Sequence, residues 1–192
     1  MAPDTKPQQQ VLLFGTFNPH KLEEVERYFN DCNYELRGGF QYDDIGEAPE
    51  EQDTLEGNAI EKARYYCNRT GIACFADDTG LEVAALDGAP GVMTARYAGT
   101  PHDPIRNMKK LLEALEGVED RAACFRIVIA YIGHHGEVKT FEGRMPGRIA
   151  KTRSGSQGFG YDPIFIPEGQ DRTFADMSMA EKNMISHRSK AI

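Results

Sequence analysis

The sequence predicts one α/β domain, with enough chain for two lobes. Its 192 residues, of which 40% are hydrophobic, suffice for a substantial core. Short apolar runs rich in branched and aromatic residues, such as 11–14 and 122–132, are typical of strands. Between them, apolar residues recur at helical spacing, as in 54–69, which indicates helices. Residues 1–10 are polar and contain two prolines, so we expect a loose tail before a single domain over residues 11–192.

The composition narrows the choice of partners. The net charge is −8 with 22 basic residues, whereas a protein that binds duplex DNA is usually basic, so no nucleic-acid partner is expected. No apolar run approaches the roughly 18 residues of a membrane span, and the start lacks the apolar stretch of a signal peptide. The four cysteines show no C-x-x-C spacing, which favours free thiols in the reducing cytoplasm.

The stretch around which the chain is organised is 74–83, Cys-Phe-Ala-Asp-Asp-Thr-Gly-Leu-Glu-Val. The apolar runs 72–76 and 81–86 predict two strands joined by a tight acidic turn. Carboxylates at a strand end are held on a rim, where Asp77 and Asp78 can bind a divalent cation or take a proton from water. The same residues are equally typical of an ordinary turn, in which Asp accepts backbone N–H bonds.

The first predicted strand, 11–14, leads into the turn Gly-Thr-Phe-Asn-Pro-His-Lys at 15–21. Asn18 is a good helix N-cap, and Pro19 is a good first helical residue. The apolar residues that follow recur at helical spacing, and the glutamates between them, Glu24 included, fall on the opposite face. The free N–H groups of such a turn suit a phosphate, although a plain capped helix with a solvated Lys21 explains the same residues.

A second helix is predicted from the cap Thr54 to Gly71. Asn58 and Lys62 are four residues apart, so they share a face outside its apolar stripe. They can grip a phosphate there, or they can be two solvated residues. An acidic connector precedes this helix, and its carboxylates, including Glu50 and Glu51, are mostly typical of a solvated surface.

The second half predicts a structural helix from residue 103 to 117, a strand over 122–132, a hairpin turn, a strand over 137–141 and a kinked strand over 143–149. The glycine-rich segment 154–163 holds two aromatic residues that can stack on a base or form a mobile loop. Ser178 opens a capping box, and a last short helix starts at Ser186. Its pair His187-Arg188 can present donors to an oxo group or a phosphate.

Six short motifs occur in a fixed order between residue 11 and the C-terminus. In that order the chain resembles the inosine triphosphate pyrophosphatase family. The motifs are Thr16-x-Asn18-x-x-Lys21, Glu56 to Ala63, Ala76 to Leu81, Gly88 to Gly91 with Ala95-Arg96-Tyr97, Gly158 to Pro163, and Glu181-Lys182-Asn183 with Ser186-His187-Arg188.

This resemblance implies a house-cleaning enzyme. It would hydrolyse deaminated purine nucleoside triphosphates (ITP, dITP and XTP) to the monophosphate and pyrophosphate, use Mg²⁺, and keep these purines out of DNA and RNA. The implied fold is an elongated, twisted mixed β-sheet flanked by helices, with two lobes and a central active-site cleft. The resemblance also implies a cytoplasmic homodimer.

The resemblance further implies a role for each matching residue. Asp78 would be the proton acceptor and a metal ligand, and Glu50 the second metal ligand, although Glu51 also fits that position. Phe17 stands where the family usually has glycine, and the final helix is short for the family. Substrate contacts would come from Thr16, Phe17, Asn18, Pro19, His20, Lys21, Lys62, Thr79 and Lys182, and at the base end from Phe159, Gly160, Tyr161, Asp162, His187 and Arg188.

Two other functions remain open. One is a related pyrophosphatase for other modified nucleotides, of the Maf type. The other is a nucleotide-binding sensor without turnover. The paired carboxylates discriminate between enzyme and sensor, because a protein that only binds has no need of a base beside the metal.

Overall fold

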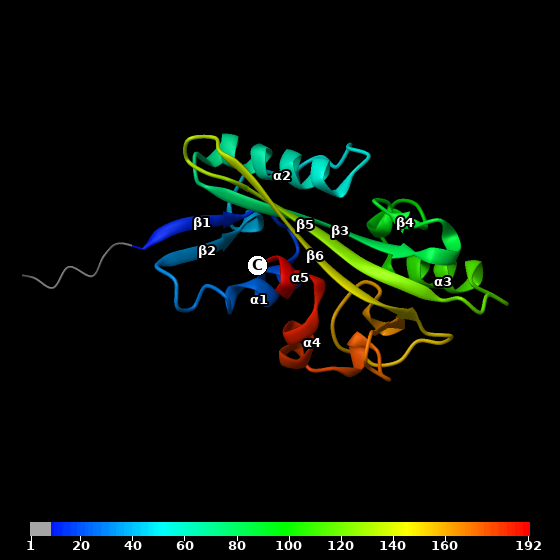
Figure 1. Cartoon of the computed structure of the whole chain (residues 1–192). Coiled ribbons are helices and arrows are strands. Elements are labelled where there is room, and N and C mark those ends of the chain that lie inside the picture. Colours follow the sequence, from blue (N-terminus) through cyan, green and yellow to red (C-terminus); the bar gives the residue numbers. More distant parts are fainter. Residues whose placement is uncertain (1–8) are drawn as a thin grey trace, which may run out of the picture.

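A computed structural model describes residues 9–192, which form a seven-stranded mixed sheet with helices on both faces (Figure 1). The strands are β1 (Gln10–Phe14), β2 (Tyr34–Gly38), β3 (Cys74–Val83), β4 (Pro90–Gly91), β5 (Ala122–Ile132), β6 (Val138–Ile149) and β7 (Phe165–Pro167). The helices are α1 (Pro19–Glu26), α2 (Leu55–Thr70), α3 (Pro104–Ala114), α4 (Met179–Ile185) and α5 (His187–Ala191). The sheet order is β2-β1-β3-β5-β6-β7, with β4 paired to β3. Strands β2, β1 and β3 are parallel, and the remaining pairs are antiparallel, which confirms the predicted mixed α/β sheet.

Strand β3 runs without interruption through the acidic stretch, so the predicted strand–turn–strand is wrong. Asp, Thr and Gly favour turns when considered alone. Here, however, every residue of β3 pairs with β5, from Cys74 opposite Ile132 to Val83 opposite Ala123. This ladder satisfies the backbone groups along the whole stretch. The two carboxylates therefore lie in the middle of a strand.

Two other boundaries also differ from the prediction. Strand β6 is one strand of 12 residues, where the sequence suggested separate strands over 137–141 and 143–149, because its register with β5 is continuous. Gln10 was assigned to the loose tail, but it begins β1 and pairs with Tyr34. The tail prediction for residues 1–8 lies outside the described residues.

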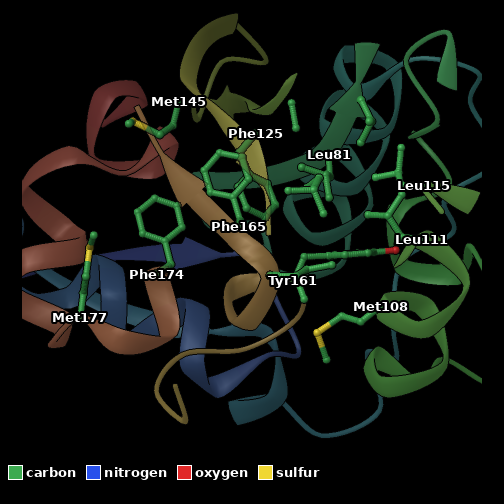
Figure 2. Close-up of a cluster of buried hydrophobic side chains, with 14 residues drawn as sticks. Leu81, Met108, Leu111, Leu115, Phe125, Met145, Tyr161, Phe165, Phe174 and Met177 are labelled. Atoms are coloured by element: carbon green, nitrogen blue, oxygen red, sulfur yellow. The ribbon is translucent and has the colours of Figure 1, made fainter. Parts of the chain in front are cut away.

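The long strands β3, β5 and β6 span the molecule and carry a separate core at each end (Figure 1). At one end, Leu81 and Phe125 pack with α3 and the segment after β6, around the stacked rings of Phe165 and Phe174 (Figure 2). Cores under α1 and α2 lie toward the other end. These ends form the two lobes, and the shared strands join them.

The side chains of the long strands alternate between two helical layers. Phe75 and Ile127 face the layer of α1 and α5, whereas Ala76 and Val128 face α2. Figure 1 shows α2 on one side of these strands and α1, α4 and α5 on the other.

The helix starts and the end of α2 lie where the sequence predicts, whereas α3 ends at Ala114, before the predicted end at Gly117. The side chain of Asn18 accepts a backbone N–H at 3.0 Å at the start of α1, and Thr54 does the same for α2. Gly71 ends α2 with φ 68°, a left-handed conformation that glycine adopts without strain. Ser178 forms the predicted capping box at the start of α4.

The short last helix is anchored by close packing on β5 and β6. His187, Arg188 and Ala191 are buried, and the ring of His187 stacks on Phe125 with 4.8 Å between centroids. Where α5 crosses β6, the strand has Gly143, and a Cβ at that position would overlap the backbone carbonyl of His187. The missing side chain therefore lets α5 approach the sheet.

The cysteines and the membrane prediction can be compared with the structure directly. All four cysteines are free thiols, as predicted, and Cys74 is buried. Within residues 9–192, none of the helices combines the length and the apolar character that a membrane crossing requires.

Gly143→Ala should destabilise the fold by about 1–3 kcal/mol, the usual range for overpacking, because α5 must shift away from β6. Urea unfolding followed by circular dichroism measures this change. Lys139→Ala is the matched control, since Lys139 is an exposed residue of the same strand. Equal stability of Gly143→Ala and wild type would show that α5 does not depend on this close approach.

Candidate active site

The main cavity lies at a gap in the edge of the sheet. On this edge, β3 pairs with β1 only at Cys74 and Phe75, and with β4 only at Leu81 and Glu82. In the part of the chain that the structure describes, residues 76–80 thus have a strand partner only on the β5 side. A cavity of about 650 Å³ opens here, bordered by the turn after β1, by α2 and by the C-terminal helices.

Strand alternation sends Asp77 and Asp78 to opposite faces of the sheet. Asp77 pairs with side chains of α1 and α5, and Asp78 with side chains of α2. Asp77 is only 2% exposed, and Asp78 only 7%. Buried carboxylates require paired charges or hydrogen bonds, and each helical layer supplies its own.

Asp77 begins a chain of alternating charges. Its Oδ1 accepts a hydrogen bond from Lys21 Nζ at 2.9 Å, and its Oδ2 accepts one from Arg188 Nη2 at 3.0 Å. Arg188 also donates through Nη1 to Glu24. The fork of this arginine therefore ties the central strand to α1.

Glu24 extends the chain of charges to the C-terminal half. Lys182 Nζ donates to Glu24 at 2.8 Å and to Asp162 at 2.7 Å. The sequence placed Glu24 on the polar face of its helix, but it is 4% exposed, because α4 and α5 bring cations onto that face. Burial alone would raise the pKa of Glu24, but Arg188 and Lys182 outweigh this effect and lower it.

Asp78 is held mainly from α2. Lys62 Nζ donates to Asp78 Oδ1 at 2.9 Å and to Glu50 Oε1 at 2.7 Å. Asn58, one turn earlier, donates to Asp78 Oδ2 at 3.1 Å. Arg96 donates to the backbone carbonyl of Glu50 at 2.8 Å. The predicted shared face of Asn58 and Lys62 is thus confirmed, but that face is buried rather than solvated.

The two adjacent carboxylates differ in basicity. Burial raises the pKa of Asp78, and Lys62 only partly opposes the rise. Burial would also raise the pKa of Asp77, but Lys21 and Arg188 outweigh it and hold that pKa well below its usual value. A carboxylate with a raised pKa is the better proton acceptor near neutral pH. Asp78 is therefore suited to act as a base, and Asp77 to remain a fixed anion.

The glycine-rich loop forms another wall of the cavity. The backbone N–H of Phe159 donates to Asp162 Oδ2 at 2.9 Å. Gly158 has φ 73°, and a Cβ there would overlap this carboxylate, so the loop requires glycine. The ring of Phe159 lies 6.0 Å from that of His20 at an interplanar angle of 16°, and Lys182 Nζ is 4.7 Å from its centroid. Phe159 thus offers an aromatic face at the cavity.

Two buried polar atoms of residues lining the cavity have no hydrogen-bond partner within residues 9–192: His187 Nδ1 and Arg188 Nε. Burial, together with Arg188 and Lys182, holds the pKa of His187 far below its usual value, so its imidazole is neutral. A neutral imidazole offers one donor and one acceptor, whereas Arg188 Nε only donates. These two atoms therefore keep an unused hydrogen-bonding capacity next to the cavity.

Asn58, which the sequence proposed as a phosphate contact, is buried against Asp78 and does not line the cavity. The cavity does bring together the residues that the family resemblance assigned to the site, apart from the alternative Glu51. These are Thr16, Phe17, Asn18, Pro19, His20, Lys21, Glu50, Lys62, Asp78, Thr79, Phe159, Gly160, Tyr161, Asp162, Lys182, His187 and Arg188. Tyr161 borders the cavity only in part, since its ring belongs to the core (Figure 2). Its hydroxyl donates to the Thr94 carbonyl at 3.0 Å. Glu51 is exposed and does not line the cavity.

For three residues of these networks, the sequence did not indicate the role that the structure shows. Arg96 belongs to one of the six motifs, so its position gave a signal that could have been followed. Asp77 was considered with Asp78 as a metal ligand or base, but not as a fixed anion paired with Lys21 and Arg188. Glu24 gave no local signal, because its burial depends on cations more than 150 positions away in the chain.

Glu50 and Asp78 fit a hard divalent cation. Both carboxylates converge on one cationic atom, Lys62 Nζ, which stands in for a cation held between them. Mg²⁺ prefers oxygen ligands and is often held by one or two carboxylates together with phosphate oxygens of the substrate. Within residues 9–192, no group of three or more His, Cys, Asp or Glu side chains could hold a metal alone. A bound substrate would thus have to supply further ligands.

Comparison with known proteins identifies the family. The model of the Ham1 family matches residues 12–192. The chain is 53% identical to the dITP/XTP pyrophosphatase of Porphyromonas gingivalis, over 95% of this chain and 94% of that protein. It is also similar to the solved Ham1 protein of Staphylococcus aureus (37% identity, TM-score 0.84) and a HAM1 protein of Coxiella burnetii (36%, 0.86), each over 95% of this chain and 94% of the other. The chain therefore belongs to the Ham1 family, which confirms the resemblance carried by its six motifs.

Proposed function

We propose that this protein hydrolyses the deaminated purine nucleoside triphosphates ITP, dITP and XTP to the monophosphate and pyrophosphate. The observation that carries the proposal is Asp78, a buried carboxylate with a raised pKa, in one cavity with Lys21, Lys62 and an unpaired base-side donor on Arg188. Similarity to a dITP/XTP pyrophosphatase supports the same substrate class. Incubation with ITP, Mg²⁺ and the protein, followed by a pyrophosphate assay, is the direct test.

In the proposed reaction, Asp78 takes the proton of the attacking water. Lys62 and Asn58 fix the orientation of its carboxylate, so that the base is held in place before substrate arrives. Mg²⁺, bound by Glu50, Asp78 and phosphate oxygens, would neutralise the negative charge that develops on the leaving pyrophosphate. Glu50 is proposed over Glu51 because it shares Lys62 with Asp78.

The phosphate end is proposed to lie at the start of α1. The residues of this turn line the cavity, and the helix start presents a positive dipole end. The N–H groups of His20 and Lys21 are already bonded to Asn18, so the free N–H groups that the sequence predicted here are not found. Lys21 adds a side-chain cation that remains 20% exposed despite its bond to Asp77. A phosphate can therefore reach this ammonium without first unfolding its surroundings.

The base end is proposed to lie between Phe159 and the pair His187-Arg188. Hypoxanthine and xanthine carry an oxo acceptor at position 6, where adenine carries an amino donor. Arg188 Nε is a donor without a partner. It would pair with the oxo group, but would face another donor in adenine.

The alternatives left open by the sequence are less well supported. The family match favours the Ham1 type over the Maf type. The raised pKa of Asp78 beside a metal-binding carboxylate favours turnover over a sensor that only binds. We also propose a cytoplasmic homodimer, since the free thiols suit a reducing compartment and the family resemblance implies two copies. Light scattering of the purified protein would measure the assembly.

Asp78→Asn should lower kcat for ITP by about 10²–10⁴, because the amide keeps the shape but is neither a base nor an anionic metal ligand. Pyrophosphate release measures the loss, and circular dichroism checks the fold. Glu51→Gln is the control, because this exposed neighbour of Glu50 should leave turnover essentially unchanged. An active Asp78→Asn enzyme would remove Asp78 from the role of base.

Chelation should abolish turnover, and Mg²⁺ should restore it. The two carboxylates would otherwise stand against a triphosphate with no dication to separate the charges. Pyrophosphate release is measured in excess EDTA and again after Mg²⁺ is added back. Full activity in EDTA would contradict a metal-dependent mechanism.

Arg188→Lys should lower the ratio of kcat/KM for ITP over ATP by at least about tenfold, since sites built to bond a substrate group owe their selectivity to that bond. Lysine keeps a positive charge beside Asp77 and Glu24, whereas an alanine would leave each of these buried carboxylates with one cationic partner fewer. Lys21→Gln is the matched control, because it should weaken both nucleotides alike. An unchanged ratio in folded Arg188→Lys would exclude Arg188 as the base reader.

A further inference from the structure

Lys62 occupies the position between the two carboxylates proposed as metal ligands. Its ammonium bridges Glu50 Oε1 at 2.7 Å and Asp78 Oδ1 at 2.9 Å, and its side chain is only 8% exposed. The other two carboxylate oxygens also have protein partners. Asn58 donates to Asp78 Oδ2 at 3.1 Å, and Arg96 Nη1 lies 3.3 Å from Glu50 Oε2. All four oxygens are therefore engaged by the protein itself.

A divalent cation and this ammonium require the same oxygen atoms. Mg²⁺ binds carboxylate oxygens directly at about 2.0–2.1 Å, so it would lie next to the ammonium on the same two oxygens and be repelled by its charge. The ammonium must therefore withdraw from Glu50 and Asp78 before both can ligate the metal.

If Lys62 withdraws and a dication takes its place, the site has an excess of positive charge that its own carboxylates do not neutralise. A dication and an ammonium together exceed the charge of two carboxylates, and a buried charge without a partner is costly. Glu24, Asp77 and Asp162 are already paired with other cations. A polyphosphate in the same cavity would supply the missing anion.

We propose that Lys62 is an internal counter-ion, which holds the metal position until a divalent cation and a triphosphate arrive together and then moves to the phosphates. The inference rests on the proposed function and adds to it an order of binding. Lysine suits this movement, because its ammonium can rotate on a flexible four-carbon stem while keeping three donors. Metal alone binds weakly, and metal and nucleotide each strengthen the binding of the other by the same factor.

Titration of the full-length protein with Mn²⁺, without nucleotide, tests this directly. Electron paramagnetic resonance measures the free ion. Lys62→Met removes the ammonium but keeps an unbranched side chain only one atom shorter, so Mn²⁺ should bind at least about tenfold more tightly than to wild type. The melting temperature of Lys62→Met should also rise more with Mn²⁺ than that of wild type. Lys21→Met is the matched control, since Lys21 is a lysine of the same cavity that bonds Asp77 instead.

Equal Mn²⁺ affinity of Lys62→Met and wild type would overturn the proposal. The same gain in Lys21→Met would also overturn it, because the effect would then come from the general field of the cavity rather than from occupancy. If Lys62→Met does not fold, wild type alone is decisive. Its melting temperature is measured with Mn²⁺, with a non-hydrolysable ITP that carries a methylene bridge between the first and second phosphorus, and with both ligands together. The proposal would be refuted if Mn²⁺ alone bound tightly, or if the shift with both ligands were only the sum of the two separate shifts.

These binding measurements require no turnover. If the protein does not hydrolyse ITP but Lys62→Met binds Mn²⁺ more tightly than wild type, the proposed function is wrong and the counter-ion proposal stands. If the protein hydrolyses ITP but Lys62→Met binds Mn²⁺ no more tightly than wild type, the proposed function stands and the counter-ion proposal is wrong.

Discussion

Neutralisation of two adjacent carboxylates in the middle of a strand is the constraint on which this structure depends. Pairing with β5 along its whole length keeps β3 straight through Asp77 and Asp78. Alternation then sends one carboxylate into each helical layer, so no single helix can neutralise both. Leaving either one buried and unpaired would cost about 3–5 kcal/mol, a large share of the stability of a typical domain. The docking of α1, α2 and α5 on the sheet is therefore tied to the charges that form the site.

The same constraint joins the two ends of the chain. Glu24 of α1 binds Lys182 and Arg188, which lie 158 and 164 positions later. The last helix has only five residues, too few to be stable by itself, and it is short for the family, as the sequence indicated. Salt bridges of Arg188, stacking of His187 and the close approach at Gly143 hold it instead. The base end of the cavity thus depends on tertiary contacts rather than on helix length.

Features set by neighbouring residues could be predicted from the sequence. The caps Asn18, Thr54 and Ser178 were predictable because capping involves only a few consecutive residues. The prediction of an acidic turn was wrong, because the turn preference of Asp-Thr-Gly is outweighed by backbone pairing of β3 with β5. That strand lies some 50 residues later in the chain, so the local sequence does not reveal the pairing.

The candidate site divides in the same way. The residues of the site could be named from sequence motifs, but the residues with which they form hydrogen bonds and salt bridges could not. Arg188 was expected to present donors to the substrate, but Glu24 and Asp77 occupy two of its nitrogens and leave Nε unpaired. The gap between β1 and β4 on the edge of β3, which makes room for the cavity, follows only from strand pairing.

The salt bridges of the site balance in charge before any ligand binds. The carboxylates are Glu24, Glu50, Asp77, Asp78 and Asp162, and their partners are Lys21, Lys62, Arg96, Lys182 and Arg188. In a chain of net charge −8, this leaves no surplus of positive charge to attract a polyanion. Affinity for a triphosphate must therefore come from an exchange of ion pairs, in which lysines turn to phosphate and a dication takes their place beside the carboxylates. Under the proposed function, such an exchange disfavours phosphates that arrive without metal, and it delivers the dication to Asp78, where the reaction needs it.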